Sequence, residues 1–422
     1  MRVLMFGWEF PPYISGGLGT ACYGLTKGLM EHGAEVLFVL PRLFGGEDAG
    51  TMRMIGAAEA ELPEEFSRFM EQGKMQLLQV NTALFPYATD KSYLSGDGAM
   101  GYDATFQSKT AMGGGLTGMY GSRLMDEVFR YASLAPDIAA RHSFDLIHAH
   151  DWLTYPAGMA ASSYAGKPMI AHVHATEYDR SGDFPNERVM QIEKMGMQAA
   201  ERVIAVSEYT KKIAIKQYHI DEKKVDVVHN GVLPGSEKPE VRVDKTFPVV
   251  VFLGRVTFQK GPEYFLYAAA KVLRNNPDVR FVVAGHGDKL LSMITLAARL
   301  KISSRVSFTG FINSDDIGQL FGDSDVYVMP SVSEPFGISA LEAARAGVPV
   351  IISRQTGVAE VLKSALKTDF WDVDGMSDAI IALLQHNSLR RWMSRNGRQQ
   401  ARMQTWNKAA SRVLTTYSKL LS

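Results

Sequence analysis

The chain has 422 residues, and 45 lysines and arginines balance 45 aspartates and glutamates, so its net charge at pH 7 is zero and no nucleic-acid or membrane partner is expected. Its composition, 46% hydrophobic and 21% charged, is that of a globular protein, and its length favours two domains of about 200 residues each. The single cysteine, Cys22, excludes an intrachain disulfide and a cysteine-based zinc cluster and favours a reducing compartment.

The first residues predict a strand, a glycine-rich turn and a helix. Residues 3–6 form an apolar run too short for a signal peptide, and no apolar run reaches membrane-spanning length, so we expect a cytoplasmic protein. Gly16 and Gly17 then open a helix to about His32, followed by a strand at 34–40. This start predicts a doubly wound α/β sheet. The glycines either let a phosphate or sugar approach the backbone or make a tight turn with positive φ; their spacing does not match the dinucleotide fingerprint.

Residues 45–121 show little regular periodicity, and glycines are frequent between 96 and 121. Such a segment cannot bury enough apolar surface to be rigid. It is either a mobile loop over a binding cleft or a surface insertion, and the lack of clustered catalytic residue types there slightly favours the insertion. Helical periodicity returns at 122–141.

Polar side chains follow the next two predicted strands. The stretch 144–152 gives a strand ending in His148, His150 and Asp151, and the strand at 168–173 is followed by His174. Ligands of open α/β sheets bind at the carboxyl ends of strands, so these residues predict a site, although a single histidine there is more often a packed or capping residue. A metal is an alternative, but alternate strand residues point to opposite faces, so Asp151 does not share the face of the two histidines. We therefore expect no metal site.

A polar, proline-containing segment at 234–239 marks a domain boundary, which gives an N-terminal domain at 1–234 and a C-terminal domain at 240–405. The strand pattern restarts at 249–253, and Arg255 and Lys260 follow in a loop where both can converge on one anion. Each charge-assisted hydrogen bond contributes roughly 1.5–3 kcal/mol, so two could hold a diphosphate. The alternative is a solvated loop. Further strands are expected at 280–284 and 306–309, and further helices at 375–386, 388–404 and 406–420.

Two glutamates lie around the predicted strand at 325–329. Glu334 falls in the loop that follows this strand, and Glu342 lies about two turns further on in a predicted helix. The junction at Gly337 presents free backbone N–H groups, which suit a phosphate. A carboxylate beside an anion site favours a second role, such as binding sugar hydroxyls. The alternative is two ordinary surface glutamates.

In this order and spacing, the motifs resemble those of the retaining two-Rossmann-domain (GT-B) glycosyltransferases, closest to the glycogen and starch synthase branch. The resemblance rests on Gly16-Gly17-Leu18, His150-Asp151-Trp152, His174, the Arg255 and Lys260 pair, and the pattern of Glu334, seven residues and Glu342. It implies an α/β fold in which two doubly wound Rossmann-like domains face a central cleft. It also implies that the helix at 406–422 packs back on the first domain.

The resemblance further implies roles for individual residues. Asp151, His174 and Glu334 would be the catalytic groups around the transferring sugar, and Glu342 would contact the nucleotide ribose. The implied donor site comprises Gly16, Gly17, Arg255, Lys260, Gly285, Phe311, Gly337, Ile338, Ser339, Glu342 and Gly357. Arg255, Lys260 and the helix N-termini expected at Gly337 and Gly357 would neutralise the leaving diphosphate, so no metal and no cofactor is expected. The absence of a well-placed nucleophile favours front-face retention over double displacement.

The implied reaction is transfer of glucose from ADP- or UDP-glucose to the non-reducing end of an α-1,4-glucan. The sequence departs from the synthases at Ile14, where they usually carry lysine, at Leu153, where they often carry histidine, and at Val358, which replaces a glycine. These departures leave the donor nucleotide and the acceptor open. The alternatives are a related transferase with a sucrose-type or cell-envelope acceptor and a non-catalytic nucleotide-sugar-binding protein. A dinucleotide oxidoreductase is disfavoured by the missing glycine fingerprint.

Overall fold

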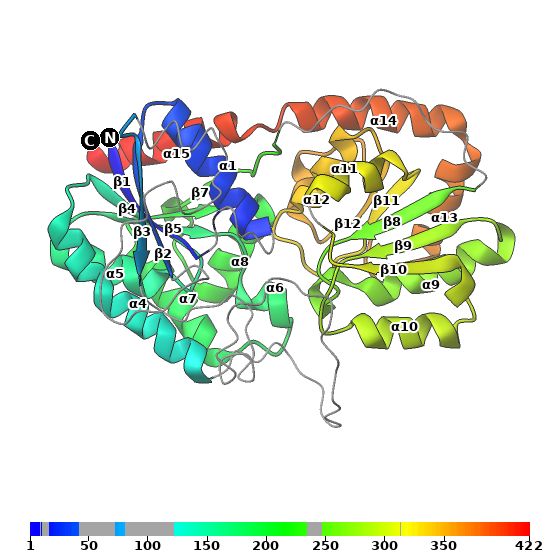
Figure 1. The fold of residues 1–422 in the computed structure, drawn as a ribbon, viewed down its shortest axis with the longest axis horizontal. Helices are drawn as coiled ribbons and strands as arrows, with labels where there is room; N and C mark the ends of the chain where they lie inside the picture. The colour runs from blue at the N-terminus through cyan, green and yellow to red at the C-terminus, as the bar shows by residue number, and fades with distance from the viewer. Residues whose placement is uncertain (9, 11–16, 42–71, 81–121, 234–246, 313) are drawn as a thin grey trace. The chain divides into compact units, whose positions relative to one another are not determined.

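The computed structural model describes residues 1–8, 10, 17–41, 72–80, 122–233, 247–312 and 314–422 (Figure 1). Gly16 and the glycine-rich segment 96–121 lie outside the described residues. The chain divides into two compact units: unit 1 comprises 1–205, 213–228 and 407–422, and unit 2 comprises 206–212 and 229–406. Each unit is built on a parallel sheet covered by helices, so the predicted pair of Rossmann-like folds is confirmed.

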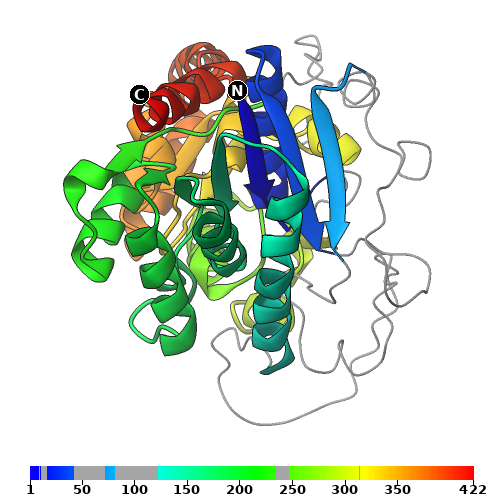
Figure 2. The same ribbon diagram turned by 90° about the vertical axis from the view of Figure 1, so that its left-hand side faces the viewer.

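Unit 1 contains a seven-stranded parallel sheet in the order β3-β2-β1-β4-β5-β6-β7 (Figure 2). Its strands are β1 (Arg2–Phe6), β2 (Glu35–Pro41), β3 (Met75–Val80), β4 (Leu146–His150), β5 (Met169–Val173), β6 (Arg202–Ala205) and β7 (Val225–Val227). The strand β3 corrects the expectation of an irregular 45–121 segment. Its polar glutamines obscure the apolar run, and pairing with β2 is what makes it a strand.

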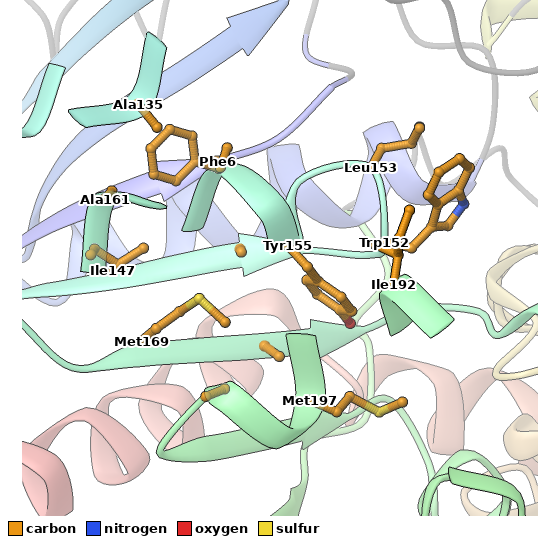
Figure 3. Packing of buried hydrophobic residues seen from close by; sticks show 14 of the residues in the cluster. Phe6, Ala135, Ile147, Trp152, Leu153, Tyr155, Ala161, Met169, Ile192 and Met197 are labelled. Carbon is orange, nitrogen blue, oxygen red and sulfur yellow. The ribbon is translucent and has the colours of Figure 1, made fainter. Parts of the chain in front are cut away.

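Helices cover both faces of this sheet. They are α1 (Gly17–Glu31), α4 (Ser122–Arg141), α5 (Tyr155–Ala165), α6 (Glu177–Ser181), α7 (Glu187–Ala199), α8 (Glu208–Tyr218) and α15 (Trp406–Leu421), with a 3-10 turn at Glu222–Lys224. The first turn of α8, up to Lys212, belongs to unit 2. One core lies between the sheet and α4, α5 and α7, where Ile147, Met169 and Tyr155 pack together (Figure 3). On the opposite face, the hydroxyl of Thr26 on α1 contacts Met5 of β1, and Tyr417 on α15 contacts His148 of β4.

Unit 2 contains a six-stranded parallel sheet in the order β10-β9-β8-β11-β12-β13. Its strands are β8 (Val249–Leu253), β9 (Arg280–Ala284), β10 (Val306–Gly310), β11 (Val326–Met329), β12 (Val350–Ser353) and β13 (Leu366–Thr368). Its helices are α9 (Pro262–Asn275), α10 (Leu290–Arg299), α11 (Ser314–Gly322), α12 (Ile338–Arg345), α13 (Val373–Gln385) and α14 (Asn387–Arg402). Short 3-10 turns lie at Phe258–Lys260, Ser303–Arg305 and Gly357–Glu360.

Two apolar cores hold unit 2 together, one on each face of its sheet. Phe252, Phe265 and Ile380 belong to the core beneath α9 and α13, and Tyr327 and Leu341 belong to the core beneath α12. The near-continuous apolar strands follow from this double cover, because a parallel strand buried on both faces cannot alternate apolar and polar residues.

In each sheet the chain adds strands first on one side of its first strand and then on the other. This switch point lies between β1 and β4 in unit 1 and between β8 and β11 in unit 2. The loops at the carboxyl ends of these strands are where α/β sheets of this kind bind ligands. None of the described helices is both long and apolar enough to cross a membrane. Cys22 is a free, buried thiol on α1.

The last helix contacts other parts of unit 1. At its start, Asn407 lies 2.8 Å from the ring of His32 and donates to Glu31, both next to the end of α1. Near its end, Thr416 donates to Asp226 of β7 at 3.0 Å, and the hydroxyl of Tyr417 hydrogen-bonds to His148. These polar contacts fix α15 along its length against three separate elements of the unit.

Candidate functional site

In unit 2, a glycine brings the loop after β8 against the loop after β11. Gly261 has a φ of 61°, and a Cβ placed there would lie 2.3 Å from the carbonyl oxygen of Pro330. Only glycine allows this approach without displacing backbone. The amide of Val332 also donates to the carbonyl of Gln259 at 2.9 Å. The loop that carries Arg255 and Lys260 is therefore fixed against the loop that carries Glu334.

Lys260 and Glu334 form an ion pair between the Nζ and Oε2 atoms. The side chains are 20% and 8% exposed, so the pair is largely withdrawn from water while one side stays accessible. Ser331 adds a hydrogen bond to the same Oε2 atom at 3.4 Å. The structure thus brings together two of the residues predicted from sequence. Arg255 lies on the same loop as Lys260 and is partly buried.

The backbone of Glu334 is held by a third loop. Its amide donates to the carbonyl of Gln355, and its carbonyl accepts the amide of Gly357, both at 2.9 Å. A Cβ on Gly357 would lie 2.1 Å from the carbonyl oxygen of Pro335. The sequence predicts a helix start with free amides at Gly357. The structure shows a four-residue 3-10 turn in which the amides of Gly357 and Val358 already have carbonyl acceptors. Gly357 thus allows close packing of the Glu334 loop.

Residues 207–209, which follow β6 in the chain but belong to unit 2, also contact the Glu334 loop. The hydroxyl of Ser207 donates to the carbonyl of Pro335 at 2.6 Å, and that of Tyr209 lies 2.9 Å from the hydroxyl of Ser333. Glu360 accepts the amides of Glu208 and Tyr209, and it pairs with His229 at 2.7 Å. Burial alone would raise the pKa of Glu360, but these hydrogen bonds outweigh it and lower that pKa.

The helix α12 begins beside Glu334. Gly337 caps it with a φ of 102°, a conformation that favours glycine, and the first-turn amides of Ile338 and Ser339 have no partner within the helix. The Ser339 hydroxyl lies 2.8 Å from that of Tyr327. One turn further on, burial raises the pKa of Glu342 to about 7. First-turn amides of this kind can donate to an anion, and the anion site expected at Gly337 stays a prediction.

The ends of β9 and β10 lie at the same edge. Gly285 has a φ of 138°, and a Cβ there would lie 1.9 Å from the carbonyl oxygen of Gly254, so only glycine fits. The amide of Gly285 donates to the carbonyl of Gly310 at 2.8 Å, immediately before Phe311, whose side chain is 43% exposed. Gly285 and Phe311 are therefore close in space, and Phe311 presents an open aromatic surface.

In unit 1, β4 and β5 place four histidine rings together: His148, His150, His172 and His174. Nε2 of His148 lies 3.0 Å from Nδ1 of His172, and Nδ1 of His150 lies 2.9 Å from Nε2 of His174. Burial lowers the pKa of all four, to about 3 for His150, so the rings are neutral at pH 7.

Asp151 fixes the backbone of His174. Its own φ is 58°, and its Oδ1 accepts the amides of His174 at 2.6 Å and Ala175 at 3.3 Å. Its Oδ2 lies 3.6 Å from the guanidinium of Arg180. Burial raises the pKa of Asp151 to about 7 although Arg180 and the two amides oppose that rise. Asp151 and His174 are thus in direct contact, with the carboxylate 2% exposed.

Arg180 also faces two glutamates. Its guanidinium lies 3.0 Å from Glu193 and 3.8 Å from Glu177, and the hydroxyl of Tyr218 donates to Glu193. Burial raises the pKa of Glu193 to about 7, against the effects of Arg180 and Tyr218. Three buried carboxylates therefore share one guanidinium, which favours the protonated form of some of them near neutral pH.

A metal site is geometrically conceivable at the histidines. His148, His150 and His172 each offer a ring nitrogen within 4.8 Å of the other two. However, both nitrogens of His148 already have hydrogen-bond partners, Tyr417 and His172. The rings of His148 and His150 are stacked, with centroids 4.4 Å and planes 13° apart. The expectation that the reaction needs no metal stays a prediction.

Gly17, the described part of the N-terminal glycine pair, opens α1. Its φ is not in the left-handed region, and a Cβ placed there would meet no described atom within 4 Å. The tight-turn interpretation therefore has no support at Gly17.

Comparison with known proteins places this geometry in a family. Residues 236–400 match the family described as glycosyl transferases group 1, and residues 116–235 match glycosyltransferase family 4. An uncharacterized glycosyltransferase of Bacillus subtilis is 30% identical over 61% of this chain and 72% of its own length. The chain belongs to the group 1 glycosyltransferases.

Two relatives match this glycosyltransferase over nearly its full length. An uncharacterized glycosyltransferase of Methanocaldococcus jannaschii is 27% identical over 99% of this chain and 98% of the relative. The glycogen synthase of Mycobacterium tuberculosis is 25% identical over 94% of this chain and 90% of the relative.

Solved structures show the same fold. Sucrose-phosphate synthase from Thermosynechococcus elongatus aligns with a TM-score of 0.73 at 17% identity, over 99% of this chain and 98% of that chain. The Anabaena protein HepE, solved in complex with UDP-glucose, aligns with a TM-score of 0.67 at 18% identity over 100% of both chains. These similarities confirm the two-domain GT-B fold predicted from sequence.

Several residues of the candidate site were not predicted from the sequence. Arg180 was visible in the polar run after β5, but the glutamates that it binds come from α6 and α7. The His-x-His spacing recurs in β4 and β5, and this repeat could have predicted that His172 joins the cluster. Tyr417 and Glu360 carried no sequence signal, because only the folded chain brings them near.

Proposed function

We propose that the protein is a retaining hexosyltransferase that moves glucose from ADP- or UDP-glucose to the non-reducing end of an α-1,4-glucan, as glycogen synthase does. The observation that carries the proposal is the Lys260–Glu334 pair at the carboxyl edge of the second sheet, beside the open amides of α12. The full-length similarity to a glycogen synthase supports the glucan as acceptor.

In this proposal, unit 2 holds the nucleotide diphosphate sugar. Lys260 and Arg255 bind the diphosphate together with the first-turn amides of Ile338 and Ser339, and Glu334 accepts hydrogen bonds from the sugar hydroxyls. Lys260 then exchanges its partner Glu334 for the diphosphate. Charge builds on the leaving diphosphate as the C1–O bond breaks, so fixed cations and amides lower the barrier. The base contacts Gly285 and Phe311, and Glu342 contacts the ribose.

In the same proposal, Asp151 and His174 of unit 1 are required for transfer. The acceptor oxygen bonds to C1 on the face from which the diphosphate leaves, the proton of the acceptor hydroxyl passes to the leaving diphosphate, and no covalent enzyme intermediate forms. Neither a metal nor another cofactor takes part, and the protein acts in the cytoplasm. Treatment with a chelator tests the metal statement directly.

A related hexosyltransferase with another acceptor is the second candidate. Ile14 and Leu153, which depart from the glycogen and starch synthase pattern, favour it. A non-catalytic nucleotide-sugar-binding protein is a weaker candidate, because the charged residues Arg255, Lys260, Glu334 and Glu342 are all present.

One screen separates these candidates. Purified protein is incubated with ADP-glucose, UDP-glucose and other nucleotide sugars, each with glycogen, with maltooligosaccharide and without acceptor. A lengthened α-1,4-glucan supports the proposal. Transfer or donor hydrolysis without lengthening of glucan supports the second candidate, and donor binding with neither reaction supports the non-catalytic protein.

A further inference from the structure

One hydrogen bond in the histidine cluster of unit 1, between His150 and His174, indicates which ring nitrogens carry the protons. Nδ1 of His150 and Nε2 of His174 are 2.9 Å apart, so one nitrogen donates and the other accepts. His150 is fully buried at the end of β4, and its other nitrogen, Nε2, has no hydrogen-bond partner among the described residues. A neutral imidazole carries a single N–H, so the direction of this hydrogen bond fixes the state of the partnerless nitrogen.

The two possible directions of the His150–His174 hydrogen bond leave Nε2 of His150 in different protonation states. If His174 donated, His150 would carry its proton on Nε2, as a buried N–H without an acceptor. Buried N–H groups without a partner are rarer in folded proteins than acceptors with a free lone pair. If His150 donates through Nδ1, its Nε2 is only a bare lone pair. The second direction is the favoured one, and His174 then carries its own proton on Nδ1.

His174 is the one ring of the cluster that is partly exposed, and no described residue hydrogen-bonds its Nδ1. Its backbone is fixed independently, because Asp151 accepts its amide at 2.6 Å. The ring is thus held on its Nε2 side by His150 and the main chain by Asp151, which leaves the Nδ1 side for a ligand.

We propose that His150 is a positioning residue that holds His174 as the neutral Nδ1–H tautomer, so that His174 gives a hydrogen bond through Nδ1 to a ligand oxygen. The ligand class is a sugar hydroxyl or a phosphate oxygen, and this part rests on the proposed function. The tautomer itself rests only on the geometry of unit 1. In this state His174 is a donor and not a proton acceptor for the ligand.

The tautomer is measured without substrate. Protein labelled with ¹⁵N at histidine gives long-range ¹H–¹⁵N correlations that distinguish Nδ1–H from Nε2–H rings, and the spectrum of His174→Gln identifies the His174 signals. The proposal expects the Nδ1–H pattern for His174 at pH 7. An Nε2–H pattern, or a doubly protonated ring, overturns it.

A matched pair of variants tests the role of His150. Asparagine carries an N–H donor on Cγ, as Nδ1 of histidine does, and leucine has the same shape as asparagine without the donor. His150→Leu should convert the His174 spectrum to a mixture of tautomers and lower kcat/KM about tenfold, the effect of one lost hydrogen bond. His150→Asn should keep the Nδ1–H tautomer and restore kcat/KM to within about threefold of the wild type.

The outcomes separate the two proposals. If both variants fold and His150→Leu leaves the tautomer and kcat/KM as in the wild type, the positioning role of His150 is overturned. If the tautomer behaves as expected but no nucleotide sugar is turned over, the proposed function fails while the proton assignment stands. Circular dichroism checks whether both variants fold. If His150→Leu does not fold, His150→Met takes its place in the same comparison.

Discussion

The two sheets share a strand order, yet the groups at their carboxyl edges differ in burial and charge. In unit 2, Lys260 and Glu334 form an ion pair on glycine-rich loops, and Lys260 keeps contact with water. In unit 1, His150 and Asp151 are buried at the end of β4, and Asp151 is engaged by amides and by Arg180. In both sheets the topology places polar groups at the carboxyl edge. The loops at that edge determine whether these groups are buried in ion pairs, as Asp151 is, or keep contact with water, as Lys260 does. The following variants test this division.

Arg180→Met should give the largest effect, and it should appear in stability. It leaves Asp151, Glu177 and Glu193 without their shared cation, and breaking a buried ion pair costs about 3–5 kcal/mol. Urea denaturation measures the free energy of unfolding. Arg188→Met, at an exposed position of α7, is the control and should change it by less than about 0.5 kcal/mol. Equal free energies of unfolding for the two variants would contradict a stabilising role of Arg180 and its three carboxylates.

Glu334→Gln should lower turnover about 100-fold while the protein stays folded, because it removes the carboxylate proposed to bind the reacting sugar and the partner of Lys260. Initial rates with the donor found in the screen measure the loss, and circular dichroism measures the fold. Turnover at the wild-type level would place Glu334 outside the site.

Glu342→Gln should change the pH dependence of stability. Burial raises the pKa of Glu342 from 4.5 to about 7, so its stabilising contribution is complete below pH 4.5 and is lost as the pH rises through 7. Glutamine cannot ionise, so the variant should match the wild type at pH 4 and exceed it by about 2 kcal/mol at pH 8, which is less than the full shift because the side chain is partly exposed. Urea denaturation at both pH values checks this, and identical curves at pH 8 contradict it.

Lys260→Ala should lower turnover at least about tenfold, since one charge-assisted contact to the transition state contributes more than about 1.4 kcal/mol. Lys271→Ala is the matched control in the same unit, because Lys271 also forms an ion pair, with the exposed Asp374, and is not a predicted site residue. The control should retain wild-type rates. Similar losses in both variants would indicate a general effect of charge.

Removal of metal ions should have the smallest effect. Dialysis against EDTA is expected to leave the transfer rate within about twofold of the untreated enzyme, because fixed cations and helix amides stabilise the leaving diphosphate. Rates before and after dialysis, and after addition of Mg²⁺ or Zn²⁺, check this. A loss that is restored by one of these ions would assign a metal to the reaction, and the histidine cluster would be the first place to look.

The sequence allowed prediction of most strands because an apolar run between turn residues has few other interpretations, as at 249–253 and 280–284. It failed at β3, where the glutamines of 75–80 weaken the apolar run and only pairing with β2 defines the strand. The candidate site residues on loops after strands were predicted from the rule that the carboxyl ends of parallel strands share one edge, and their roles stay predictions.

The sequence by itself determined two parallel-sheet folds and the positions of Lys260, Glu334, Asp151 and His174 after strands, since periodicity and turn residues are local properties of the chain. Only the tertiary structure decided their partners. The pairing of Glu334 with Lys260, of Asp151 with Arg180 and of His150 with His174 depends on loops that meet after folding. Burial, which moves the pKa values of Asp151 and Glu342 to about 7, is likewise a property of the packed molecule and not of any segment.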